Sequence, residues 1–144
     1  MYKLGTKSME QFETLHPDIQ MILSYLIRYY DFSVLEGHRT KARQIQLHRD
    51  GKSKLDGITS RSKHQSLPSM AVDIMPYKKG TNAFEDNEKE RARFYTMMGM
   101  VKVIAAMLLE QGLITHQVRF GMDWDGDDTF RDQTFDDLPH FELV

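Results

Sequence analysis

The 144-residue chain has no cysteine, only four prolines and a single tryptophan. The absence of thiols excludes disulfide bridges and thiolate zinc sites, so a metal would have to bind through histidine and carboxylate side chains. No apolar run comes near the roughly 20 residues that a membrane-spanning helix needs, and none follows the N-terminus as in a signal peptide. We therefore expect cytoplasmic synthesis and no membrane insertion.

The charge of the chain is unevenly distributed, although the formal net charge is only -2. Basic residues concentrate in residues 39–63, whereas residues 123–142 are strongly acidic. A basic segment suits an anionic polymer, and on charge alone that polymer could be a nucleic acid. Because aromatic residues do not alternate with the basic ones and no nucleic-acid motif is present, we expect no nucleic-acid binding.

Length and hydrophobic periodicity predict one α+β domain over residues 1–144. Residues 1–16 are expected to form an arm packed on the body. Thr40 is a candidate N-cap, and Gly51 and Gly112 are candidate helix ends. Helices are expected over residues 17–29, 40–50 and 88–111, and strands over 32–36, 71–75, 118–124 and 140–143.

Two histidines and two carboxylates suggest a zinc site with its catalytic base. A catalytic zinc takes three protein ligands and keeps one position for water, and His64, Asp73 and His140 are the candidate ligands. Asp73 interrupts an apolar run, so its buried carboxylate needs a partner, either a metal or a cation such as Arg39. Asp137 lies three residues before His140 and is the candidate base, which would take a proton from water and pass it to the leaving amine.

At these positions the chain resembles the zinc peptidases of the D-alanyl-D-alanine carboxypeptidase type, whose phage branch includes cell-wall endolysins. The shared pattern is Ser62-x-His64, then Ala71-x-Asp73, then an acidic residue three positions before a final histidine. Residues 37–54 resemble the family's substrate segment, and residues 119–124 resemble the strand that precedes its last ligand.

The chain departs from the common family pattern in two places. Eight residues, 65–72, separate the first histidine from the aspartate, which is two more than usual, and the usual glycine is missing. We expect a longer turn to absorb the difference. The base is Asp137 where many relatives carry Glu, and this shorter base occurs in the phage branch.

The resemblance implies a small antiparallel sheet flanked by helices, as in Hedgehog and D-alanyl-D-alanine peptidase domains. It also implies a monomeric zinc enzyme that cuts the stem peptide of bacterial peptidoglycan, first of all at the L-alanyl-D-glutamate bond, as a phage endolysin. Such an enzyme is made in the host cytoplasm and reaches the wall with the help of a separate pore-forming protein. The alternatives are a D-alanyl-D-alanine carboxypeptidase, a virion-associated protein and a non-catalytic zinc-binding cell-wall module.

Several polar residues near the predicted ligands are candidates for supporting roles. The resemblance implies that the Arg39 guanidinium holds a substrate carboxylate or an oxyanion, although it could be only a solvated charge. Gln44 could assist in substrate binding or simply pack, and Ser62 could hydrogen-bond near the metal or only fill the loop. Glu142 would share a strand face with His140 and could orient its imidazole.

Carboxylates alternate around Gly126 at Asp123, Asp125 and Asp127, which resembles part of a calcium loop. The helices and the terminal glutamate of an EF-hand are missing, so a solvated acidic loop is the alternative to a regulatory calcium site. We interpret the four other histidines as surface or core residues. The methionines at positions 97, 98, 100 and 107 are interpreted as core residues of one helix.

Overall fold

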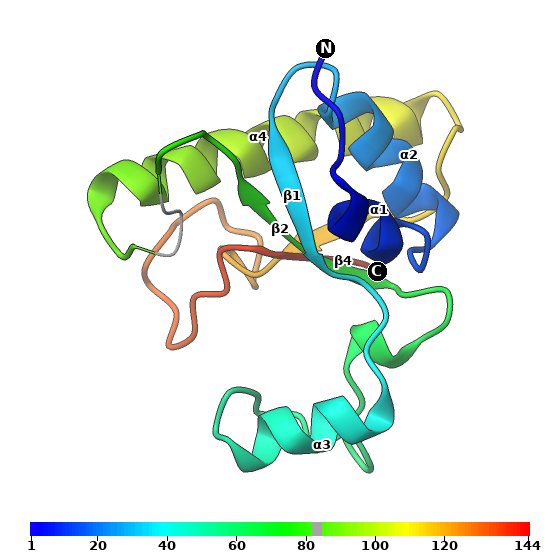
Figure 1. Cartoon of the computed structure of the whole chain (residues 1–144), viewed down its shortest axis with the longest axis vertical. Helices are drawn as coiled ribbons and strands as arrows, with labels where there is room; N and C mark the ends of the chain where they lie inside the picture. The colour runs from blue at the N-terminus through cyan, green and yellow to red at the C-terminus, as the bar shows by residue number, and fades with distance from the viewer. Residues whose placement is uncertain (82–84) are drawn as a thin grey trace.

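The computed structural model describes residues 1–81 and 85–144, and its centre is a four-stranded antiparallel sheet (Figure 1). The strand order is β1-β2-β4-β3. The α+β class and the antiparallel sheet predicted from the sequence are confirmed. The strands are β1 (Phe32–Glu36), β2 (Ala71–Pro76), β3 (Val118–Phe120) and β4 (His140–Leu143).

The helices begin and end close to the predicted residues. The Thr40 side chain accepts a hydrogen bond from the Arg43 backbone at the start of α3, and Gly51 and Gly112 adopt the left-handed conformation just beyond α3 and α4. The helix α2 is shorter than predicted, because the chain turns after Leu26 to enter β1. The described helices are α1 (Thr6–Phe12), α2 (Pro17–Leu26), α3 (Lys41–Arg49), the short 3-10 helix η1 (Lys63–Gln65) and α4 (Glu88–Glu110).

The segment of residues 1–16 contains a helix, α1, that the sequence did not indicate. The side chains of Ser8, Gln11 and Thr14 accept hydrogen bonds from the backbone of Val34, Gly37 and His38. These bonds supply partners to backbone N–H groups in and just after β1, which is an edge strand of the sheet.

Helices α2 and α4 pack against each other, and α4 also contacts strands β2 and β3 (Figure 1). Alternation along β2 directs Val72 and Ile74 into this core, so Asp73 lies on the opposite face of the sheet. The face of the sheet away from α4 is therefore where polar side chains can gather.

The methionines of α4 do not all belong to the core. Met97 and Met98 are fully buried, whereas Met107 is 51% exposed, so the prediction for Met107 was wrong. By length and composition alone α4 could cross a membrane, which the sequence did not lead us to expect. Its buried residues join the hydrophobic core, and the absence of membrane insertion stays a prediction.

The strand predicted over residues 118–124 ends at Phe120. The chain then turns, and the Asp123 backbone N–H bonds to the Phe120 carbonyl. This turn brings Gly121 against Asp137, where a Cβ on residue 121 would lie 2.3 Å from the Asp137 carbonyl oxygen. The shorter strand thus lets the loop before β4 approach the sheet closely.

Candidate active site

The buried His64 is positioned by η1, which Ser62 caps. The Ser62 hydroxyl accepts from the His64 backbone N–H at 3.2 Å, and the Gln65 side chain completes the capping box. The His64 Nδ1 atom bonds to the Gly37 carbonyl at 2.7 Å, so Nε2 is the nitrogen left to face the site. Ser62 therefore contacts the backbone of a predicted ligand.

Asp73 and His140 face each other across the antiparallel pair of β2 and β4. The His140 Nδ1 atom lies 3.0 Å from Asp73 Oδ1, and its Nε2 atom lies 2.9 Å from Glu142 Oε2. The histidine thus presents Nδ1 toward the aspartate while Glu142 holds the far side of the ring.

The three predicted metal ligands converge on one point. His64 Nε2 lies 3.3 Å from both His140 Nδ1 and Asp73 Oδ1. Ligands about 2.0–2.1 Å from a tetrahedral zinc lie about 3.3 Å from one another, so the donor set and its spacing fit zinc. The longer turn between His64 and Asp73 is absorbed, because Ser69 in that turn bonds to the backbone of Thr14 and Gly37.

The electrostatics of this cluster favour a cation. Burial raises the pKa of Asp73, but hydrogen bonds with His140 and His64 outweigh it and hold the pKa well below its usual range. Burial lowers the pKa of His140, yet contacts with Asp73 and Glu142 raise it to about 9. A positive charge is therefore stabilised between these carboxylates.

Asp137 lies beside the cluster, with Oδ2 4.0 Å from His140 Nδ1. Burial, and then repulsion by Asp73, raise the pKa of Asp137 to about 6. The Asp137 backbone N–H donates to the Gly121 carbonyl at 3.0 Å, which fixes the loop that carries the carboxylate. A carboxyl with this pKa is suited to accept and return a proton near neutral pH.

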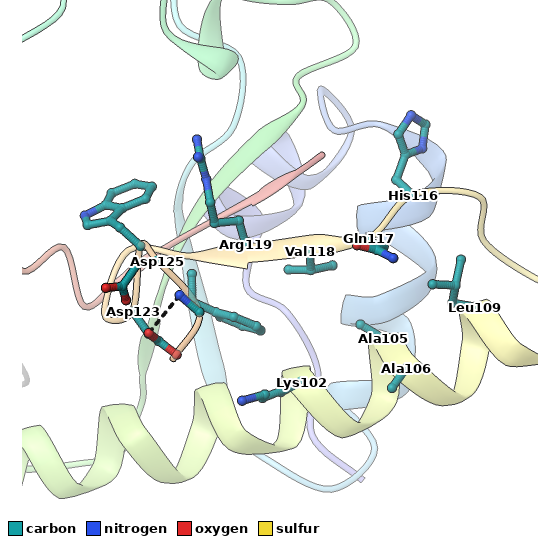
Figure 2. A pocket seen from close by; sticks show the side chains of 13 residues that line it. Lys102, Ala105, Ala106, Leu109, His116, Gln117, Val118, Arg119, Asp123 and Asp125 are labelled. Carbon is teal, nitrogen blue, oxygen red and sulfur yellow. Dashed lines mark hydrogen bonds between the residues drawn. The ribbon is translucent and has the colours of Figure 1, made fainter. Parts of the chain in front are cut away.

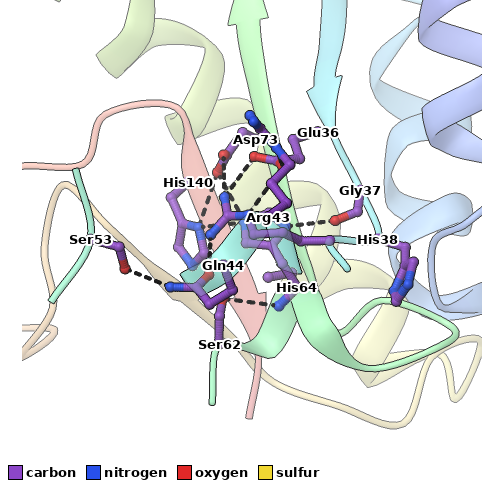
Figure 3. Close-up of polar contacts among 12 residues, drawn as sticks. Glu36, Gly37, His38, Arg43, Gln44, Ser53, Ser62, His64, Asp73 and His140 are labelled. Atoms are coloured by element: carbon purple, nitrogen blue, oxygen red, sulfur yellow. Dashed lines mark hydrogen bonds and ion pairs between the residues drawn. The ribbon is translucent and has the colours of Figure 1, made fainter. Parts of the chain in front are cut away.

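Arg39 lines the same pocket, and its partners are Glu36, Gln44 and Asp73, which Figure 3 labels. It donates to Glu36 Oε2 at 2.6 Å and to Gln44 Oε1 at 2.8 Å, and Nη2 lies 3.8 Å from Asp73 Oδ2. The sequence reasoning missed Glu36, although its position three residues before Arg39 at a strand end was a usable indication. The substrate contact predicted for Arg39 and Gln44 stays a prediction. The observed contacts place the Arg39 guanidinium where its charge stabilises the Asp73 carboxylate.

The ligand cluster opens into a cavity of about 520 Å³. Trp124 lines this cavity. Two loops form the walls, the basic segment after α3 and the acidic segment before β4. Among the lining residues are Leu47, Lys52, Lys54, Leu55, Arg61, Arg119, Trp124 and Phe135.

A second cavity of about 430 Å³ lies between α4 and β3, next to the acidic loop (Figure 2). Asp123, Asp125 and Asp127 each offer an oxygen within 4.8 Å of the others. The Asp123 carboxylate already accepts from the backbone of Gly126 and Asp128. Calcium binding at this loop stays a prediction.

The remaining histidines lie outside the ligand cluster. His16 and His116 meet around the buried carboxylate of Asp18, and Asp18 accepts from the His116 ring at 2.8 Å. His38 and His48 bond to the backbone carbonyls of Ser66 and Ser53. His16, Asp18 and His116 offer ligand atoms within 4.8 Å of one another, so the interpretation of these histidines as surface or core residues stays a prediction.

Two imidazoles and one carboxylate beside a second, proton-accepting carboxylate are the features of a mononuclear metallohydrolase site. The sequence profile of the phage L-alanyl-D-glutamate peptidase family matches residues 1–144, and the chain belongs to this family. The resemblance seen in the sequence motifs is thereby confirmed.

Two relatives agree with this assignment. The L-alanyl-D-glutamate peptidase of Escherichia phage T5 is 30% identical over 149 residues, which cover 99% of this chain and 98% of that protein. The crystal structure of the Serratia marcescens L-Ala D-Glu endopeptidase ChiX matches with a TM-score of 0.68 at 29% identity, over 99% of this chain and 90% of that one.

Proposed function

We propose that the chain is a zinc-dependent endopeptidase that cuts the L-alanyl-D-glutamate bond of the peptidoglycan stem peptide. Membership of the phage L-alanyl-D-glutamate peptidase family supports the bond and the substrate. The observation that carries the metal assignment is the convergence of His64 Nε2, His140 Nδ1 and Asp73 Oδ1 within 3.3 Å.

In the proposed mechanism His64, Asp73 and His140 hold the metal, and Asp137 moves the proton. Zinc at this position would polarise the scissile carbonyl and make a water more acidic. Asp137 takes a proton from the attacking water as the water oxygen bonds to the carbonyl carbon of L-alanine. Asp137 then returns the proton to the amide nitrogen of D-glutamate as the C–N bond breaks, so that a carboxylic acid and an amine result.

The neighbouring residues keep this arrangement in place. Glu142 accepts from His140 Nε2, which leaves Nδ1 deprotonated and directed toward the metal. Arg39 balances the charge of Asp73 and also holds Glu36. Arg39 lines the cavity, and in this proposal its guanidinium also faces a substrate oxyanion.

The proposed setting is lysis of a bacterial host at the end of phage growth. The enzyme would act as a monomer on the wall after a separate pore-forming protein lets it leave the cytoplasm. A D-alanyl-D-alanine carboxypeptidase remains the alternative within the class, and a virion component or a non-catalytic zinc-binding wall module remains the alternative outside it.

Mass spectrometry of purified peptidoglycan tests the proposal. Protein loaded with zinc should release fragments with new L-alanine C-termini and D-glutamate N-termini, and a chelator should prevent their release. Release of D-alanine alone would identify a carboxypeptidase instead. No chelator-sensitive product on walls of several chemical types would favour a binding module, and detection of the protein in purified virions would favour a particle component.

A further inference from the structure

Two of the carboxylates that line the active-site cavity are already paired with nearby arginines. Glu36 is paired with Arg39 and Arg43, and Glu142 is paired with Arg119. These arginines are therefore already partly neutralised by carboxylates.

Three other cations on one wall of the cavity differ from these arginines in their contacts. Lys52, Lys54 and Arg61 line the cavity, are exposed, and form no ion pair within residues 1–81 and 85–144. All three come from the loop between α3 and η1. This wall therefore carries a surplus of positive charge facing the cavity.

The loop is fixed to the site by hydrogen bonds. The fully buried Gln44 accepts from Arg39 and donates to the Ser53 hydroxyl at 2.8 Å and the Leu55 carbonyl at 2.7 Å (Figure 3). Ser53 lies between Lys52 and Lys54 in the sequence, so a single chain of contacts links these lysines to Arg39. The cations are thus attached to a wall whose backbone is held in place.

Lys54 reaches toward the opposite wall. Its Nζ atom lies 5.6 Å from the centre of the Phe135 ring, two residues before Asp137 in the sequence. An aromatic ring contributes a weak attraction and leaves the ammonium free to bind an anion. Lys54 is therefore the cation placed between the two loops at the cavity mouth.

The substrate of the proposed function supplies an anion at the matching place. In the stem peptide D-glutamate continues the chain through its γ-carboxyl group, so its α-carboxylate is free and sits on the carbon that bears the leaving nitrogen. We propose that Lys54, assisted by Lys52 and Arg61, binds this α-carboxylate and makes the enzyme prefer walls in which it is not amidated. The inference rests on the proposed function and adds a specificity determinant to it.

Two synthetic stem peptides, one with the free D-glutamate α-carboxylate and one with the α-carboxamide, test the inference. The zinc-loaded wild type should cleave the carboxylate form about tenfold more efficiently, because a charge-assisted hydrogen bond is lost on amidation. Lys54→Gln should lower kcat/KM for the carboxylate form by about tenfold, mainly through KM, and leave the carboxamide form within about twofold. The triple variant K52Q/K54Q/R61Q should abolish the preference.

The controls separate this inference from folding defects and from the proposed function. Lys41→Gln, which changes an exposed lysine of α3 outside the cavity, should behave as wild type on both peptides. A peptide amidated only at the third residue should be cleaved like the carboxylate form. Equal cleavage of both forms by the wild type, or equal loss on both in the variants, would overturn the carboxylate subsite while the endopeptidase stands. Failure to cleave either form would overturn the proposed function and this inference with it.

Discussion

The imidazole of His140 is held at both ring nitrogens, by Asp73 at Nδ1 and by Glu142 at Nε2. Glu142 is buried, and Arg119 donates to it through Nε at 3.1 Å. The orientation of this proposed ligand therefore depends on a residue two positions along the same strand. Loss of such an outer partner typically weakens metal binding by about 10–100-fold.

Glu142→Ala should accordingly lower zinc affinity by about 10–100-fold, as measured by competition with a chromophoric chelator. Glu142→Gln retains an acceptor for His140 and should lose less. Glu10→Ala, an exposed change on α1, serves as the control and should leave affinity unchanged. Equal affinity of the Glu142→Ala protein and the wild type would show that the ring is held by other contacts.

Gly121 allows the close approach of the Asp137 loop, because an added Cβ would lie 2.8 Å from the Asp137 Cβ. Gly121→Ala should displace the base and lower turnover by about 100-fold, since a shift of about 1 Å has an effect of that size. Zinc content should not change. Gly99→Ala, where nothing lies within 4 Å of the new methyl group, should keep full turnover, and full turnover of Gly121→Ala would refute this role.

At the residue scale the sequence motifs singled out His64, Asp73 and His140, whose side-chain atoms lie within 3.3 Å of one another in the structure. They did not indicate Gly121, whose role depends on a contact with Asp137 elsewhere in the fold. Arg39 illustrates the difference. Its position was predictable, but the bond from its guanidinium to Gln44 depends on how the chain turns between β1 and α3.

At the scale of elements, capping residues and periodicity predicted the helices and strands well, and tertiary contacts explain the errors. α1 is only seven residues long and is held by side-chain bonds to the backbone in and just after β1, which no local pattern reveals. The strand over residues 118–124 was predicted too long, because Gly121 is needed for the contact with Asp137. The register of β2 with β4, which places Asp73 opposite His140, also arises only on folding.

A buried methionine and an exposed methionine of α4 should respond differently to truncation. Met98→Ala removes a fully buried side chain and should lower the free energy of unfolding by about 2–5 kcal/mol. Met107→Ala, at a half-exposed position, should change it by less than about 0.5 kcal/mol. Urea denaturation measures both, and similar losses for the two variants would contradict the packing described for α4.

Asp18 connects the start of α2 to the segment between α4 and β3, through hydrogen bonds from Thr115 and His116. Burial raises the pKa of Asp18, but the hydrogen bonds outweigh it and hold the pKa below its ordinary value. A lowered pKa means that the charged carboxylate stabilises the folded state above the unfolded-state pKa of about 3.9, and that this stabilisation is lost as the pH falls through the folded value.

Asp18→Asn should therefore lower the free energy of unfolding by about 1–3 kcal/mol at neutral pH. The difference from wild type should shrink progressively below about pH 4. Thermal denaturation at a series of pH values measures it. A difference that does not change between pH 7 and pH 3 would mean that the carboxylate charge contributes nothing at this junction.

At the scale of the whole molecule, the two faces of the sheet have different roles. One face packs on α4 and forms the core, while Asp73 on β2 points to the other face and meets His140 of β4 and His64 of η1. The loops after α3 and before β4 enclose the cavity over this cluster. The sequence motifs could predict which residues take part, whereas the shape and charge of the enclosed cavity depend on how the two loops fold over it.

The central claim is that His64, Asp73 and His140 hold zinc while Asp137 moves the proton, and one variant separates these roles. Zinc content and turnover should be measured side by side on the wild type and on Asp137→Asn. We predict that the variant binds an equimolar amount of zinc as the wild type does and loses turnover by about 100-fold or more. Turnover near the wild-type level in the zinc-loaded variant would contradict the assignment of Asp137, and loss of zinc would place Asp137 among the ligands.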